Sequence, residues 1–122
     1  MQGVRNRVND FLTIYSELAN KTNEIICILL SSKLSGTYSI GVTAAKEVKS
    51  DCHIEVIDSQ TSATGLGLLV IEAAKAAKEG MNLSQLSDMI HRLIPKTHVI
   101  VTCDTVKYLY IIQRMRNFTD IM

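Results

Sequence analysis

The sequence is short of proline, of aromatic residues and of net charge. Its 122 residues include one proline and no tryptophan, and 5% are aromatic. Thirteen Lys and Arg against twelve Asp and Glu leave a formal charge of +1, too weak a field to attract nucleic acid or an anionic membrane. The longest apolar runs, residues 25–30 and 66–71, fall well short of the roughly 20 residues of a membrane span. We therefore expect neither a nucleic-acid partner nor a membrane-spanning segment.

Cysteine is also scarce, with Cys27, Cys52 and Cys103 widely spaced and odd in number. That usage favours reduced thiols and a cytoplasmic location over a disulfide framework. No apolar run follows the arginines near the amino terminus, so no signal peptide is expected. The length fits one domain, and 47% apolar residues are sufficient for a buried core.

The hydrophobic pattern predicts an α/β fold. Residues 25–30 are apolar without alternation, which is typical of a parallel strand covered on both faces by helices. Two further strands are expected. Helical periodicity and capping signals predict helices in the segments between the three strands. The predicted strands cover about 25–30, 53–57 and 98–102, and the predicted helices about 9–19, 36–49, 62–79, 83–94 and 104–116. This order predicts a three-layer α/β/α sandwich around a small parallel sheet of about three strands.

Several local signals refine this prediction. Asn82 with Gln85 forms a capping box before the helix over 83–94, and Gly80 supplies the left-handed stop of the helix before it. The first half of the helix over 62–79 is apolar all round, which predicts burial on most sides. Gly65 and Gly67 lack the third glycine of a dinucleotide fingerprint, so we interpret them as permitting close helix packing. Three strands are few for five helices with apolar faces. This ratio suggests a missing strand, a partner domain or a dimer.

Polar residues gather where the predicted strands end. Ser31-Ser32, Asp58-Ser59 and Cys103-Asp104-Thr105 follow the three strands, and Ser35, Thr37, Thr61 and Ser62 come soon after. In parallel sheets ligands bind beyond these carboxyl ends, and helix amino termini there favour an anion such as a carboxylate or phosphate. The alternative is that these residues only cap helices and terminate strands.

No catalytic constellation is evident. His53 and His98 open strands, about 16 Å from the serine-rich edge, and His91 lies inside a helix, so no histidine is placed to activate a serine. A metal site would need Asp58, Asp104 and Cys103 together, without a close Cys or His pair, so we expect neither a metal nor a cofactor. A small-molecule transferase using the Ser35 loop as an anion cradle stays open as an alternative.

The segment Ile28 to Tyr38, which contains S-S-K-L-S-G-T-Y, resembles the signature loop of DegV-family proteins. Residues 56–59, the glycine-bearing helix over 62–70 and the D-T-V-K-Y-L string over 104–109 are similar to later parts of that family. The resemblance runs from about residue 10 to residue 114. It implies a bacterial fatty-acid-binding protein with two α/β domains, which presents its acyl chain to a separate ATP-using fatty acid kinase subunit and has no catalysis of its own.

The resemblance also implies site residues. Ser35 would hold the carboxylate, and Ser32, Gly36 and Thr37 would shape its loop. Asp58, Ser59, Ser62 and Arg114 would line a further edge of the pocket. Burial of a long alkyl chain gains about 0.8 kcal/mol per methylene, while hydrogen bonds offset the desolvation of the head group.

The sequence departs from the family pattern at both ends. The family's first strand and its T-S-Q-P-S loop are replaced by residues 1–9, which carry Arg5 and Arg7, and a glycine pair is lost near Arg114. We expect residues 1–122 to form one partial DegV-like domain without the second domain. The alternative function is a remnant or interaction module that forms a homodimer through its apolar helix faces and binds no ligand.

Overall fold

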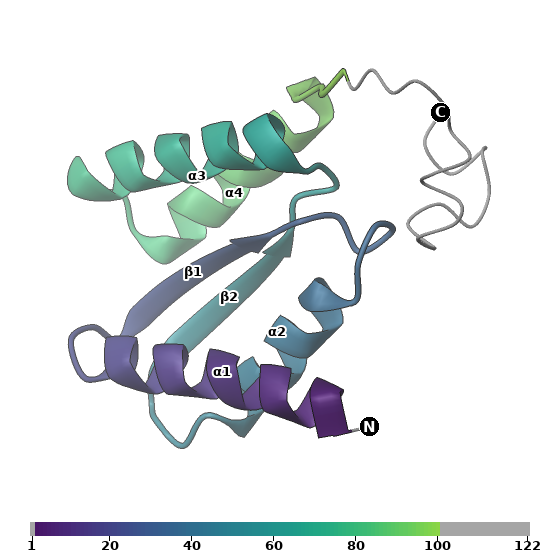
Figure 1. The fold of residues 1–122 in the computed structure, drawn as a ribbon. Helices are drawn as coiled ribbons and strands as arrows, with labels where there is room; N and C mark the ends of the chain where they lie inside the picture. Colours follow the sequence, from purple (N-terminus) through teal and green to yellow (C-terminus); the bar gives the residue numbers. More distant parts are fainter. Residues whose placement is uncertain (1, 101–122) are drawn as a thin grey trace, which may run out of the picture.

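The structure, a computed structural model, describes residues 2–100, and these form three layers (Figure 1). Two parallel strands lie in the middle, with α1 and α2 on one face and α3 and α4 on the other. The elements are α1 (Gln2–Ala19), β1 (Glu24–Leu29), α2 (Thr37–Glu47), β2 (His53–Asp58), α3 (Ala63–Lys78), α4 (Leu83–Leu93) and the 3₁₀ helix η1 (Ile94–Lys96). The predicted α/β/α architecture is confirmed.

The two strands pair in register from Glu24 opposite His53 to Leu29 opposite Asp58. Successive side chains of a strand point to opposite faces. Accordingly Ile26 and Ile28 pack toward α3 and α4, while Cys27 packs toward α1 and α2. Because both faces of β1 are covered, its sequence is apolar without alternation.

Each face of the sheet has its own hydrophobic core. The core on the α3–α4 side contains Ile57, Leu69, Ala73, Ile90 and Ile94. The core on the α1–α2 side contains Val8, Tyr15, Ile40 and Ala44. Each core is made by the apolar stripes of two helices, and together they fix which helix ends meet at the carboxyl edge of the sheet.

The first helix begins earlier than predicted. We expected it to start near residue 9, but α1 begins at Gln2. Val8 is only 4% exposed, and Arg5 forms an ion pair of 2.9 Å with Glu47 of α2. Contacts with the neighbouring helix therefore support a first turn that has no local capping signal.

A third strand was expected over residues 98–102. The structure describes residues 98–100 of it, and these do not form a strand. His98, Val99 and Ile100 belong to no strand or helix, and Ile100 is 93% exposed. Thr97 and Val99 instead pack against Gly65 at the start of α3. Because of this contact, residues 97–99 lie against the start of α3 and do not pair with the sheet. The end of this predicted strand and the predicted helix over 104–116 lie outside the described residues.

The expectation that the first half of α3 is buried on most sides is also wrong within residues 2–100. Leu68 is 60% exposed, and Val70 and Ile71 are exposed as well. Only the stripe of Gly65, Leu69, Ala73 and Ala76 is buried. Residues at this spacing lie on one side of the helix, which packs against the sheet. No part of residues 2–100 covers the opposite side of α3.

Candidate functional site

The loop between β1 and α2 carries the main candidate residues, and it wraps around Ser31. The hydroxyl of the buried Ser31 accepts a hydrogen bond from the backbone N–H of Lys33 at 3.3 Å. Its carbonyl accepts from the N–H groups of Leu34 and Ser35. These bonds fix the backbone that presents Ser35 at the amino end of α2.

Ser35 and Thr37 form a pair of hydroxyls at this end of α2. Ser35 Oγ lies 2.8 Å from Thr37 Oγ1 and also accepts the backbone N–H of Thr37 at 3.3 Å. Both residues are half-buried, whereas Gly36 between them is exposed and provides no side-chain cap. Side-chain hydroxyls and backbone N–H groups at a helix amino terminus together form surroundings that favour an anion.

Arg7 of α1 reaches the same pair. Its Nη2 donates a hydrogen bond to Thr37 Oγ1 at 3.2 Å. Figure 1 shows how this comes about: the amino end of α1 lies at the same end of the molecule as the carboxyl ends of β1 and β2. Sequence reasoning did not assign Arg7 to the site, because its approach depends on how α1 crosses the sheet layer.

The loop between β2 and α3 joins the first loop at the same edge, as predicted. Asp58 Oδ1 accepts the backbone N–H of Ser32 and that of Gln60, each at 3.1 Å. Two backbone bonds add to this, from Ser31 N–H to the Thr61 carbonyl and from Ser59 N–H to the Leu29 carbonyl. The structure therefore brings Ser32, Ser35 and Asp58 to one edge of the sheet.

The roles of Ser59 and Ser62 differ in the structure. Ser59 is 1% exposed, and its hydroxyl both donates to the Thr61 carbonyl and accepts the Thr61 N–H, so it holds the loop together. Ser62 is the residue before α3, but its side chain makes no capping hydrogen bond. The capping alternative therefore does not account for Ser62, although the bond from the Thr37 N–H to Ser35 Oγ is of that structural kind.

Gln60 in the second loop and Ala63, the first residue of α3, hold strained backbone conformations. Gln60 has φ 56° and Ala63 has φ 47°, in the left-handed region that favours glycine. Such conformations cost of order 1–3 kcal/mol each and persist where surrounding bonds enforce them. Here the bonds of Asp58 and Ser59 hold the turn. Arg114 and the predicted Cys103–Thr105 loop lie outside the described residues.

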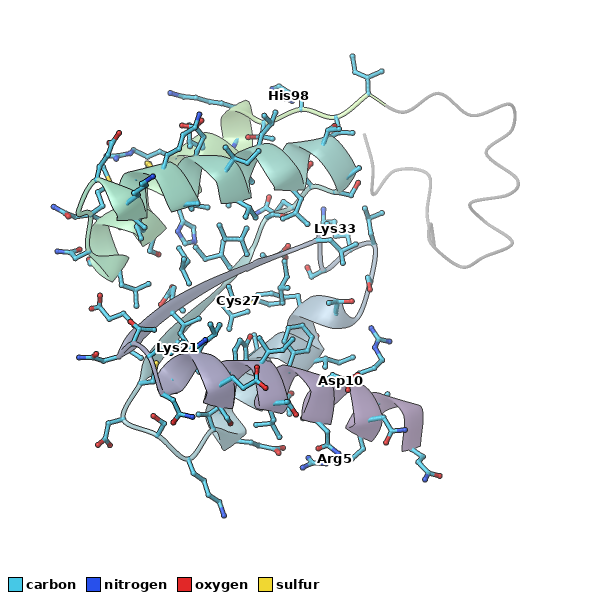
Figure 2. The ribbon with its side chains drawn as sticks, turned by 60° about the vertical axis from the view of Figure 1, so that its left-hand side comes forward. Arg5, Asp10, Lys21, Cys27, Lys33 and His98 are labelled. Atoms are coloured by element: carbon cyan, nitrogen blue, oxygen red, sulfur yellow. The ribbon has the colours of Figure 1, made fainter. Side chains whose placement is uncertain are left out.

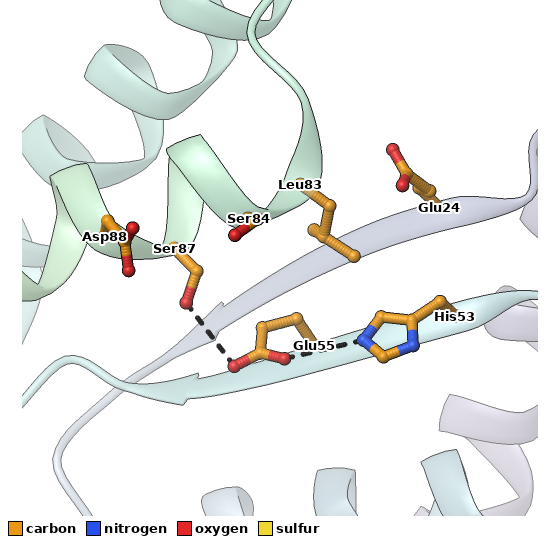
Figure 3. A pocket seen from close by; sticks show the side chains of 7 residues that line it. All are labelled: Glu24, His53, Glu55, Leu83, Ser84, Ser87 and Asp88. Carbon is orange, nitrogen blue, oxygen red and sulfur yellow. Dashed lines mark hydrogen bonds and ion pairs between the residues drawn. The ribbon is translucent and has the colours of Figure 1, made fainter.

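A cavity of about 340 Å³ lies at the opposite edge of the sheet, beside the first turn of α4 (Figure 3). In it Glu55 accepts a hydrogen bond from Ser87 and lies 3.7 Å from His53 Nε2. The lining consists of Glu24, His53, Glu55, Leu83, Ser84, Ser87 and Asp88. Three carboxylates make this hollow unfavourable for an anion, and His53 lies at the edge away from Ser35, as predicted.

Within residues 2–100 no cluster of His, Cys, Asp or Glu has the makings of a metal site, and no helix in that range is long and apolar enough to cross a membrane. Burial raises the pKa of the Cys27 thiol, and contact with the Tyr15 hydroxyl opposes part of that rise. Cys27 is in the middle of β1 and faces the α1–α2 layer, apart from the loops (Figure 2). The groups gathered at the loop edge are therefore hydroxyls, backbone N–H groups, the Asp58 carboxylate, which accepts two of those N–H groups, and the Arg7 guanidinium.

A model of the family described as "Uncharacterised protein, DegV family" matches residues 5–118. The chain belongs to the DegV family. A DegV domain-containing protein of Caldanaerobacter subterraneus subsp. tengcongensis is 36% identical over 101 residues, which are 83% of this chain and 36% of the relative. A DegV domain-containing protein of Clostridium perfringens is 34% identical over 105 residues, 84% of this chain and 37% of the relative. The chain thus spans little more than a third of these relatives' length.

Solved DegV structures share the fold. A DegV-family protein from Thermus thermophilus, described as binding fatty acid, aligns with a TM-score of 0.68 and 28% identity over 72% of this chain and 31% of its own. A DegV lipid-binding protein from Thermotoga maritima aligns at 0.67 and 26%, over 73% and 31%. DegV of Bacillus subtilis, described as a fatty-acid-binding protein, aligns at 0.65 and 26%, over 72% and 31%.

Proposed function

We propose that this chain is a fatty-acid-binding DegV domain that holds a long-chain carboxylate at the loop between β1 and α2. The observation that carries the proposal is the pair of hydroxyls at Ser35 and Thr37, 2.8 Å apart at the carboxyl edge of the sheet. The solved relatives that share this fold are described as binding fatty acids. A carboxylate accepts hydrogen bonds from hydroxyl and backbone N–H donors of this kind.

In this proposal Ser35 is the principal carboxylate ligand, and Ser32, Gly36 and Thr37 shape the loop around it. Asp58 acts through the backbone, because its carboxylate accepts the Ser32 N–H and, as an acceptor only, gives no hydrogen bond to an anionic ligand. Ser62 and Arg114 form the further edge of the pocket, and the buried Ser59 supports that edge from inside its loop. The acyl chain lies on apolar surface and gains about 0.8 kcal/mol for each buried methylene.

The role we propose is binding and presentation rather than catalysis. The bound acyl group is offered to a separate ATP-using kinase subunit in the cytoplasm. Residues 1–122 supply one DegV-like domain, and they span 31% of the solved relatives. The remaining wall of an acyl tunnel therefore comes from outside these residues, either from a longer chain or from a second copy in a homodimer. An exposed apolar strip on α3, which includes Leu68 and Ile71, is compatible with such an arrangement.

The test combines native mass spectrometry of the purified chain with titration by oleate. We expect co-purified or added fatty acid to bind in stoichiometric amount. Ser35→Ala should weaken oleate binding by about tenfold, because one hydrogen bond to a charged group is lost. Ser39→Ala, which changes an exposed serine four residues after Ser35 in the first turn of α2, is the matched control and should bind as the unmodified chain does.

Two outcomes would contradict the proposal. A chain that purifies without lipid and takes up no added oleate supports the alternative of a non-binding interaction module. A chain that binds oleate equally well with Ala at position 35 keeps lipid binding but removes Ser35 from the site. Turnover of a nucleotide by the chain alone would instead support the transferase alternative.

A further inference from the structure

Arg7 is the residue of the loop edge that neither the motif nor the family pattern assigns. Its guanidinium Nη2 is 3.2 Å from Thr37 Oγ1, and Thr37 Oγ1 is 2.8 Å from Ser35 Oγ. A chain of short contacts therefore joins a positive charge on α1 to the hydroxyl proposed to hold the carboxylate. A guanidinium has five N–H donors, and the bond to Thr37 uses one of them.

The charge of Arg7 is not neutralised by an acidic partner among residues 2–100. The neighbouring Arg5 differs, because it forms a 2.9 Å ion pair with Glu47. The other ion pairs of the described residues join His53 to Glu55 and Lys75 to Glu72. Asp10 lies three residues beyond Arg7 on the same helix but forms no ion pair with it. A cation at a hydroxyl pair, without a carboxylate of its own, is suited to an anionic ligand.

We propose that Arg7 is a second head-group ligand, whose guanidinium pairs with the carboxylate of a fatty acid held at Ser35 and Thr37. This inference rests on the proposed function and deepens it. The ligand preference it adds is for an ionised carboxylate over a neutral head group of the same chain length. Arginine suits this role because its planar fork donates two parallel hydrogen bonds to a carboxylate while it stays charged at every physiological pH.

The experiment compares oleate with oleyl alcohol, which has the same chain length without the charge, on the 122-residue chain and its variants. Arg7→Ala should weaken oleate binding by about five- to tenfold, at the lower end if water screens the exposed guanidinium, and should change oleyl alcohol binding by less than about twofold. Arg7→Lys should recover part of the oleate affinity. Arg5→Ala, which removes a paired arginine from the same helix, is the matched control and should leave oleate binding unchanged.

A structural role for Arg7 predicts a different pattern. If the bond to Thr37 only holds α1 against α2, Arg7→Ala should lower the melting temperature and weaken both lipids alike. Arg7→Gln keeps a side-chain donor for Thr37 but removes the charge, so it distinguishes the two roles. Loss of the preference for oleate over oleyl alcohol supports the proposal, and binding of both lipids as in the unmodified chain overturns it. Equal affinity of the unmodified chain for the two lipids overturns the Arg7 proposal while lipid binding stands. Binding of neither lipid overturns both.

Discussion

Gly65, in the first turn of α3, packs closer to its neighbours than any residue with a side chain can. An added Cβ would lie 2.5 Å from Thr61 Oγ1 and 2.5 Å from Val99 Cγ2. Gly67, two residues on in the same helix, has no such neighbour within 4 Å. The same helix thus offers one glycine that the packing requires and one that it does not.

We predict opposite effects of alanine at these two positions. Gly65→Ala should lower the free energy of unfolding by about 1–3 kcal/mol, since overpacking forces the loop or residues 97–99 to shift. Gly67→Ala should raise it by about 0.5–1 kcal/mol, because alanine restricts the unfolded chain and favours helix. Urea unfolding followed by circular dichroism measures both changes. Equal changes at the two glycines would show that helix propensity, not packing, determines the effect of alanine on the free energy of unfolding.

The glycines predicted close packing at both Gly65 and Gly67, and the structure shows it at Gly65 but not at Gly67. The serine-rich string predicted the hydroxyls of the Ser35 loop, since it carries that information locally. Residue identities did not predict what approaches Gly65, because Thr97 and Val99 are more than thirty residues away. The contact of Arg7 with the Ser35 loop could not be predicted for the same reason. Its neighbour Thr37 is thirty residues distant in sequence, and nothing in the sequence near Arg7 indicates that contact.

At the scale of elements, α4 is the helix whose start is best defined by its own sequence. Asn82 Oδ1 accepts the Gln85 N–H at 2.9 Å, and Gln85 Oε1 accepts the Asn82 N–H at 3.1 Å. This reciprocal pair is the predicted capping box. The helix then buries Leu83, Leu86 and Ile90 along one stripe.

Loss of this cap should destabilise the protein measurably. Asn82→Ala should lower the free energy of unfolding by about 1 kcal/mol, because the hydrogen bond from the Gln85 N–H to the Asn82 side chain is lost. Ser84→Ala, an exposed change within the first turn, should alter it by less than about 0.5 kcal/mol. Denaturant midpoints of the two variants give the comparison. An Asn82→Ala midpoint matching that of Ser84→Ala would mean that tertiary packing alone sets the start of α4.

Other elements show why boundaries and strands were harder to predict. The end of α3 followed its local signal, since Gly80 adopts φ 100° as expected. The start of α1 had no such signal, because its first turns depend on contacts with α2. Residues 98–100 have the composition of a strand, but strand formation needs a partner with free backbone groups, which composition does not reveal.

For the molecule as a whole, the α1–α2 layer buries two groups that ionise at high pH. Burial raises the pKa of Cys27, and burial, with the adjacent Cys27, raises that of Tyr15 well above its usual value. The Tyr15 hydroxyl also donates a hydrogen bond to the Gly41 carbonyl at 3.3 Å. The folded protein therefore keeps both protons at pH values where the unfolded chain loses them.

The free energy of unfolding should consequently be largest below the ordinary pKa of a thiol and fall as the pH rises beyond about 9, first through Cys27 and then through Tyr15. The sign follows from proton binding: above that pH the unfolded state binds fewer protons than the folded state. Urea unfolding across this pH range tests it, with Cys27→Ala as the control that removes the first part of the decline. A level free energy up to about pH 10.5 would contradict this account.

The order of elements predicted the three-layer arrangement of the whole molecule, because parallel crossovers in a sheet leave few alternatives. It did not predict the exposed side of α3. Helical periodicity reports how many sides of a helix are apolar, but not whether the polypeptide that covers them lies within these residues.

The hydrogen bonds that cross between the two loops at the sheet edge also constrain how the site moves. Asp58 joins Ser32 to Gln60, and the Ser31–Thr61 and Ser59–Leu29 backbone bonds run beside it. Neither loop can swing away without breaking bonds to the other, so we expect them to open as one cooperative unit. The amide protons of Ser31, Ser32, Ser59 and Gln60 should then exchange with deuterium at closely similar protection, whereas independent loops would give two distinct levels. If the proposed carboxylate at Ser35 requires this concerted opening, its exchange should be no faster than the exchange of these four amide protons.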